Sequence, residues 1–156
     1  MRIGLITAFV LLALGTSSEA ATFQQGGLRI SEPWSRSAAA HTTGAGYLTL
    51  TNTGKVAETL TVIKTPAAAR VEMHKTSMAA GMMSMKRLDK GLILRPGESV
   101  SFAPGGYHLM LVDLNKALKA GDAFPATLVF LSGTKIQVVF PVKATGSVGA
   151  DHMSHH

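Results

Sequence analysis

Hydrophobic and polar residues alternate with a period of two along most of the chain after its first twenty residues. Leu48 and Leu50 flank Thr49, and Leu60 and Val62 flank Thr61. Successive side chains of a β-strand point to opposite faces, so this pattern predicts strands with one buried face. The same alternation marks four further segments, at residues 71–73, 100–102, 107–111 and 136–142.

Turn-forming residues separate these predicted strands. Pro104-Gly105-Gly106 is one such group, and Ser132-Gly133-Thr134 predicts a three-residue hairpin loop with glycine available for a positive φ. Short strands at this spacing are typical of a β-sandwich or a Greek-key barrel. We expect a single all-β domain, with one or two helical turns only at residues 114–120, where Asp113 is a possible cap.

The N-terminus has the pattern of a secretory signal peptide. Arg2 precedes an uncharged apolar run at residues 3–15, and Ser18-Glu19-Ala20 supplies the small residues of a cleavage site. The run is shorter than the roughly 20 residues that span a bilayer, which disfavours the alternative of an uncleaved anchor. We expect a signal peptide at 1–20, a β-domain at 21–143 and a polar tail at 144–156. Export from the cytoplasm follows, with no stable membrane insertion after cleavage.

Composition removes several kinds of chemistry. The 156 residues include eight methionines and six histidines but no cysteine, which excludes disulfides, thiolate metal sites, a His₂Cys blue-copper centre and a cysteine nucleophile. The formal charge of +6 comes from scattered lysines and arginines without interleaved aromatics, so nucleic acid is not an expected partner. Hydrolase motifs such as Gly-x-Ser-x-Gly and His-Glu-x-x-His are missing, and we expect no enzyme.

The methionines and histidines instead suggest a metal site. Five of the eight methionines lie between Met73 and Met85. His108 and Met110 are two residues apart on a predicted strand and therefore share the face opposite to Tyr107. Imidazole and thioether form a soft, uncharged ligand set that favours Cu(I) over zinc, calcium or magnesium.

The spacing of these residues resembles that of a known family. His74, ten residues, Met85, twenty-two residues and then His108-Leu109-Met110 is similar to the signature of the periplasmic copper chaperones of the PCuAC family. Four flanking segments carry the likeness further: Trp34-Ser35-Arg36, residues 46–52, residues 71–74 and residues 104–111. The resemblance covers residues 28–141.

The resemblance implies a cupredoxin-like Greek-key barrel that binds one Cu(I) through His74, Met85, His108 and Met110. It also implies delivery of copper to the copper-A subunit of cytochrome c oxidase, with a thiol-bearing assembly factor as a possible second partner. Three alternatives stay open: copper storage or detoxification, a redox protein that uses bound copper, and a structural β-domain whose methionines are core residues.

Other methionines and one arginine have ordinary structural interpretations. Met73 lies on the predicted core face, where packing is favoured over ligation. Arg36 is a candidate partner for a carboxylate such as Glu72. Methionine adapts to irregular spaces, so three more methionines are expected to fill gaps: Met78, Met82 and Met83.

The C-terminal tail carries a second group of possible ligands: His152, Met153, His155 and His156. Histidine-rich tracts bind metal, and imidazoles in a polar tail suit Cu(II). The sequence therefore predicts a secondary copper site in the tail. The alternative is a tail that does not select among metals.

Overall fold

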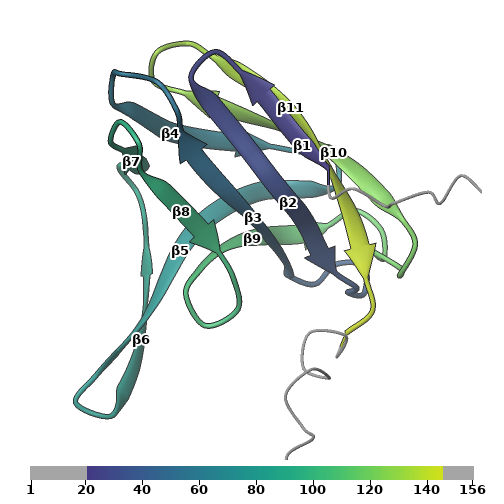
Figure 1. Cartoon of the computed structure of the whole chain (residues 1–156). Coiled ribbons are helices and arrows are strands. Elements are labelled where there is room, and N and C mark those ends of the chain that lie inside the picture. Colours follow the sequence, from purple (N-terminus) through teal and green to yellow (C-terminus); the bar gives the residue numbers. More distant parts are fainter. Residues whose placement is uncertain (1–20, 146–156) are drawn as a thin grey trace, which may run out of the picture.

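The computed structural model describes residues 21–145, which form eleven β-strands and no helix within that range (Figure 1). The strands are β1 Thr22–Gln25, β2 Leu28–Arg36, β3 Gly44–Asn52, β4 Glu58–Lys64, β5 Ala68–Ala79, β6 Met82–Arg87, β7 Leu92–Leu94, β8 Ser99–Phe102, β9 Tyr107–Leu114, β10 Ala123–Phe130 and β11 Lys135–Lys143. The predicted all-β, single-domain fold is confirmed. The expected signal peptide and residues 146–156 of the expected tail lie outside the described residues.

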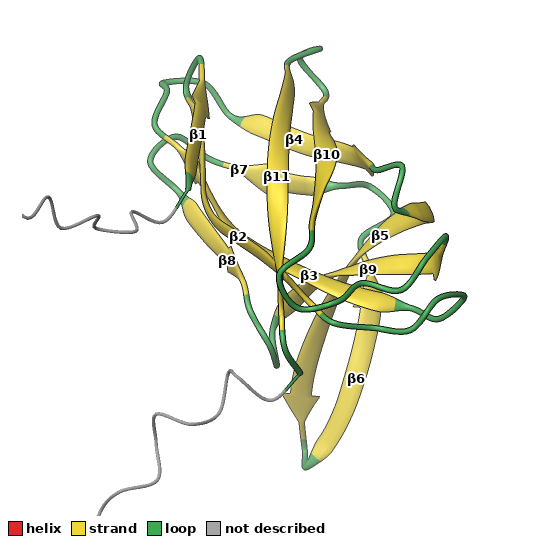
Figure 2. Ribbon diagram, turned by 90° about the vertical axis from the view of Figure 1, so that its right-hand side faces the viewer, coloured by secondary structure: helices red, strands yellow, loops and turns green. Residues whose placement is uncertain are grey.

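Most neighbouring strands are antiparallel, in the order β6-β5-β9-β8-β3-β2-β11-β10-β4-β7. Two pairs are parallel, β2 with β11 and β8 with β9, and β3 also pairs with β9. β4 and β5 lie near opposite ends of this order and nevertheless contact each other. The sheet therefore curls around a single core, as the crossing strands in Figure 2 show.

The core consists of the inward-facing residues of the alternating strands. β11 is the clearest case, because Ile136, Val138, Phe140 and Val142 are all buried and their neighbours are exposed. Met73 is 6% exposed and belongs to this core, which confirms its packing role. Figure 1 shows that the β5–β6 hairpin extends beyond the body formed by the other strands.

The helical turns expected at residues 114–120 do not form. Leu118 instead pairs with Ala38 through two backbone hydrogen bonds, of 2.8 and 3.0 Å, and its side chain is buried. Asp113 has a φ of 54°, in the left-handed region, whereas a helix N-cap residue usually has β-region angles. Burial of Leu118 and its pairing with a distant segment outweigh the local helical preference.

The alternation in β4 is also interrupted. Leu60 is fully buried but Val62 is 43% exposed, and Ile63 takes the next inward position. The register with β10 shifts here, since Phe130 pairs with Leu60 and the adjacent Val129 pairs with Val62. One extra residue in a strand reverses the faces of all that follow, so the strict period of two fails at this bulge.

Candidate metal site

Three adjacent strands, β6, β5 and β9, form the platform for the predicted ligands. His74 on β5 lies directly opposite His108 on β9, and their ring centroids are 5.6 Å apart with the planes inclined by 26°. The preceding pair, Met73 and Leu109, is buried in the core. Because faces alternate along a strand, the two imidazoles lie together on the other side of the sheet.

The two methionines of the predicted set lie on either side of this histidine pair. Met110 is opposite Glu72 on β5, and Met85 is opposite Thr76 on the same strand. Each is thus a diagonal neighbour of His74, at roughly 7–8 Å in a regular sheet. The structure places all four predicted ligands on one face, with His74 between the two thioethers.

Met85 and Met110 are displaced from His74 in opposite directions along β5. Two strand spacings and four residues separate them, which corresponds to about 16 Å between Cα atoms in a flat sheet. His74, His108 and Met110 therefore form the compact part of the site. The β5–β6 hairpin must twist or bend towards β9 for Met85 to share the same ion.

Each histidine has an acceptor for one of its ring nitrogens. Nε2 of His74 lies 2.9 Å from Oε2 of Glu72, and Nδ1 of His108 lies 3.2 Å from the carbonyl oxygen of Gly106. Nδ1 of His74 is buried and, within residues 21–145, has no hydrogen-bond partner. Metal-binding histidines usually donate one N–H to a carboxylate or a backbone carbonyl, which fixes the lone pair on the other nitrogen. With Nε2 of His74 and Nδ1 of His108 next to acceptors, Nδ1 of His74 and Nε2 of His108 are the ring nitrogens that would be available to a metal ion.

Glu72 was not among the residues predicted to serve the site. Its Oε1 accepts a hydrogen bond of 2.8 Å from Nε of Arg70 and lies 3.5 Å from Nη1 of Arg87. The hydrogen bonds from Arg70 and then from His74 lower the pKa of this carboxyl to about 2, so it is ionised near neutral pH. The sequence feature that could have identified Glu72 is its spacing from His74, because residues two apart on a strand share a face.

The suggested pairing of Arg36 with Glu72 is wrong. Arg36 lies on β2, and β3 and β9 separate that strand from β5. Its guanidinium carbon lies 5.6 Å from the centroid of the Tyr47 ring, an aromatic neighbour on β3. Glu72 is instead satisfied by cations on its own strand and on β6.

The methionines of the β5–β6 hairpin do not fill gaps in the core, contrary to the expectation for three of them. The four exposed side chains, with their exposed fractions, are Met78 (65%), Met82 (75%), Met83 (71%) and Met85 (55%). A two-residue turn, Ala80-Gly81, closes the hairpin, and both residues have positive φ, as a type I′ turn requires. Within residues 21–145 no second layer covers the hairpin, so its thioethers are accessible there.

The donor set distinguishes this site from a hard metal site. Among residues 21–145, no three histidine or carboxylate side chains are grouped so that they could hold an ion. Beside the two imidazoles, the strand register brings the thioethers of Met85 and Met110 to this face. That combination selects a soft ion such as Cu(I).

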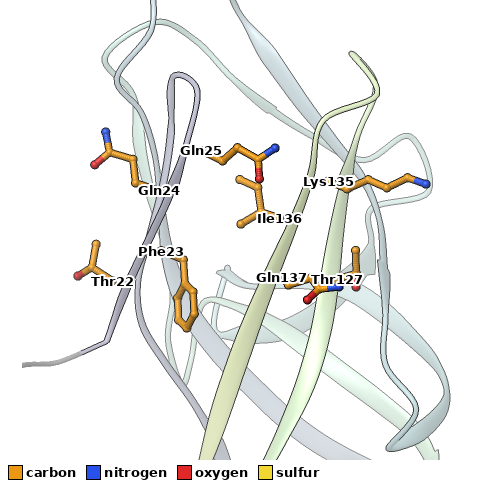
Figure 3. A pocket seen from close by; sticks show the side chains of 8 residues that line it. All are labelled: Thr22, Phe23, Gln24, Gln25, Thr127, Lys135, Ile136 and Gln137. Carbon is orange, nitrogen blue, oxygen red and sulfur yellow. The ribbon is translucent and has the colours of Figure 1, made fainter.

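A groove elsewhere in the molecule offers a different kind of surface. It lies between β1 and the β10–β11 hairpin, and Figure 3 shows its lining: Thr22, Phe23, Gln24, Gln25, Thr127, Lys135, Ile136 and Gln137. None of these is a histidine or a methionine. The groove therefore adds no donor to the site on β5 and β9.

Two expectations are not addressed by this geometry. The four tail residues proposed as secondary ligands, His152, Met153, His155 and His156, lie outside the described residues. The expectation of no stable membrane insertion is addressed only in part: within residues 21–145, no helix is long and apolar enough to cross a bilayer.

Comparison with solved structures gives matches to copper-binding domains. The copper-bound PCuAC domain from PmoF2 is 27% identical, with a TM-score of 0.67 over 80% of this chain and 98% of that one. The Cu(I) form of DR1885 from Deinococcus radiodurans is 25% identical, with a TM-score of 0.56 over 84% of this chain and 85% of that one. The chain thus has the fold of PCuAC domains.

Comparison with other sequences identifies the family. A protein of Leifsonia xyli subsp. xyli named "Putative lipoprotein Lxx21020" is 30% identical over 130 residues, which are 83% of this chain and 78% of the relative. The family described as "Putative lipoprotein LpqE-like" matches residues 28–142, nearly the range over which the sequence resembles PCuAC proteins. The chain belongs to the LpqE-like family.

Proposed function

We propose that this protein is a copper chaperone, without enzymatic activity, that binds one Cu(I) ion through His74, Met85, His108 and Met110. The observation that carries the proposal is the pair of stacked histidines, each with one ring nitrogen next to an acceptor. This is how proteins prepare imidazoles for metal binding. The shared fold with the copper-bound PCuAC domain supports copper as the ion.

The accessibility of the site suits transfer better than permanent storage. His74 is largely covered, with a side chain 14% exposed, whereas Met85 is 55% exposed. A partner can approach from the Met85 side and supply its own ligands before the histidines release the ion. Neutral soft donors also favour the reduced ion, which argues against a redox protein that cycles its copper.

The finer proposal concerns the cell compartment and the recipient. The name of the Leifsonia xyli relative and the family description both indicate lipoproteins, which supports an exported protein of the cell envelope. We place the mature protein in the periplasm, after removal of residues 1–20 as a signal peptide. Its recipient is the copper-A subunit of cytochrome c oxidase, with a thiol-bearing assembly factor as a second partner. Storage or detoxification of copper is the alternative.

Anaerobic titration with Cu(I) against a competing chelator tests the binding site. We expect one tight equivalent in the wild type and a large loss of affinity in the double variant His108→Ala, Met110→Ala. His41→Ala is the matched control, because His41 is an exposed histidine near Asp113 and outside the platform. Unchanged affinity in a folded double variant would exclude the proposed site.

Delivery requires a separate experiment. Copper-loaded protein is mixed anaerobically with an apo copper-A domain in its reduced state, and the copper content of each is measured after separation. Transfer of Cu(I) to the copper-A domain is expected. Retention of the ion by a donor that binds it normally would favour storage or detoxification.

The proposed secondary site in the tail is tested with Cu(II). Deletion of the residues after Asp151 removes His152, Met153, His155 and His156. We expect this truncation to lower the Cu(II) stoichiometry and to leave Cu(I) affinity unchanged. An unchanged Cu(II) stoichiometry would contradict the tail site.

A further inference from the structure

The outer half of the β5–β6 hairpin carries a second group of thioethers on the same face as the predicted copper ligands. Met78 on β5 lies directly opposite Met83 on β6. Met78 is four residues from His74, and Met83 is two residues from Met85, so the alternation of faces places all four on one side. Directly opposed side chains have Cβ atoms about 4.5–5.5 Å apart, close enough for both sulfurs to reach one ion.

The two faces of the hairpin differ in chemistry. On the opposite face, Ser77 pairs with Ser84 through a hydrogen bond of 3.2 Å, and Lys75 lies opposite Lys86. That face has the polar composition of an ordinary solvent-exposed ribbon. Sulfur is concentrated on the face that leads to His74, and of the four exposed hairpin methionines only Met82 lies on the polar face.

Burial does not explain Met78 and Met83. Their exposed fractions of 65% and 71% leave most of their apolar surface in water, so they contribute little to the core. Among the described residues, neither one is part of the core cluster or packs against it. Two flexible, exposed thioethers held opposite each other are nevertheless a suitable pair of ligands for a soft cation.

We propose that Met78 and Met83 form a second, weaker site for Cu(I) at the tip of the hairpin. Two thioethers provide fewer donors than the four-ligand site, and imidazole is missing from the pair, which explains the lower affinity. The binding itself depends only on the opposed methionines. The further role of the pair as an entry point rests on the proposed function of the His74 site.

Met85 connects the two sites. It lies between the tip pair and His74 along the same face, opposite Thr76. An ion moves inward when a bond to the sulfur of Met85 forms and a bond to Met78 or Met83 breaks. The ion remains Cu(I) throughout, and the thioethers neither gain nor lose protons or electrons.

Silver(I) is a suitable probe because it is a soft, closed-shell monovalent cation that does not change its oxidation state under these conditions. The full chain, labelled with ¹³C at the methionine methyl groups, is titrated with Ag(I) and followed by NMR. We expect the first equivalent to shift the signals of Met85 and Met110. The second equivalent should shift those of Met78 and Met83 and leave Met82 unchanged.

Variants then separate the two sites. In the double variant Met78→Leu, Met83→Leu, which conserves side-chain volume, the second binding step should disappear and the first should keep its affinity. Met82→Leu is the matched control and should retain both steps. A second step that persists in the double variant would overturn the proposal, as would a Met82 shift equal to those of Met78 and Met83.

The same spectra distinguish this proposal from the proposed function. If Met85 and Met110 do not respond to the first equivalent but Met78 and Met83 bind Ag(I), the tip site stands and the four-ligand site fails. If Met85 and Met110 respond and the second equivalent shifts only Met153 of the tail, the tip site is refuted. Slower Ag(I) loading of the first site in the double variant would support the entry role, and an unchanged rate would refute it.

Discussion

β11 and β6 show how differently one sheet uses its hydrophobic residues. Four of the nine residues of β11 are buried in strict alternation, whereas all six residues of β6 are exposed although three of them are methionines. β11 lies in the body of the fold, and β6 extends away from it (Figure 1). A hydrophobic pattern therefore predicts a buried face only where another part of the fold covers that face.

The exposed methionines must be explained by their chemistry rather than by packing. Met73 and Met85 are twelve residues apart in the sequence, yet the first is 6% and the second 55% exposed. Methionine at a covered position stabilises the fold by removing apolar surface from water. At an uncovered position this stabilisation is small, and what the side chain offers instead is a soft sulfur donor, as the proposed copper site requires.

The largest expected effect is the difference in stability between truncating the buried Met73 and truncating the exposed Met85. Met73→Ala leaves a cavity in the core and should lower the free energy of unfolding by about 2–5 kcal/mol. Met85→Ala changes an exposed side chain and should alter stability by less than about 0.5 kcal/mol. Urea denaturation measures both values.

Copper binding should respond in the opposite order. Anaerobic Cu(I) titration is expected to show a loss of affinity in Met85→Ala and near wild-type affinity in folded Met73→Ala. If Met85→Ala lowers stability as much as Met73→Ala, the hairpin methionines are structural and the contrast is wrong.

Two glycines extend the comparison to the backbone. Gly91, which precedes β7, and Gly81, at the hairpin tip, have φ angles of 82° and 75°. An added Cβ would overlap the backbone carbonyl oxygen of Leu60 at Gly91 but meets nothing within 4 Å at Gly81. Gly81→Ala should therefore lower stability by about 1 kcal/mol through strain alone. Gly91→Ala should lower it by a further 1–3 kcal/mol, roughly the cost of overpacking.

Thermal unfolding of the two variants measures this difference. Gly81→Ala also leaves the body of the fold unchanged, so its amide signals outside the hairpin should match those of the wild type. Equal destabilisation by both substitutions would mean that the body and the hairpin tip constrain their glycines equally.

The carboxylate of Glu72 provides a third, smaller effect. Glu72→Ala removes the acceptor of the His74 N–H and should weaken Cu(I) binding by about 10–100-fold, as loss of such partners generally does. Asp89→Ala is the matched control, because Asp89 also pairs with Arg87 but does not contact His74. Competition titrations of both variants measure the effect, and equal affinities would show that Glu72 does not position the histidine.

Sequence periodicity predicted six of the eleven described strands (β3, β4, β5, β8, β9 and β11), the buried position of Met73 and the shared face of His108 and Met110. It failed where long-range structure decides. The bulge opposite Val129 turned Val62 outward, and pairing with Ala38 prevented helical turns around Leu118. Neither event has a local signature, because each depends on a strand or segment that is distant in the sequence.

The candidate site shows the same limit. The two-residue spacing placed His108 and Met110 on one face, but only the strand register puts His74 opposite His108 and separates Met85 from Met110. Exposure of the hairpin methionines was equally inaccessible to the sequence, since a period of two is the same whether or not a second layer covers a strand. The sequence therefore shows which donor side chains are available, whereas the register of β6, β5 and β9 decides which of them lie close together.

The smallest predicted effect concerns the turn that holds the hairpin. Ala80 has a φ of 51°, a left-handed conformation that disfavours a residue with a Cβ. Ala80→Gly relieves this strain and should stabilise the hairpin by up to about 1 kcal/mol. Hydrogen exchange of the β6 amides should slow accordingly, whereas exchange in β11 should stay unchanged. If Met85 has to move towards β9 to join the histidines, a stiffer hairpin should also bind Cu(I) more slowly; faster binding would indicate that the hairpin already holds Met85 in place.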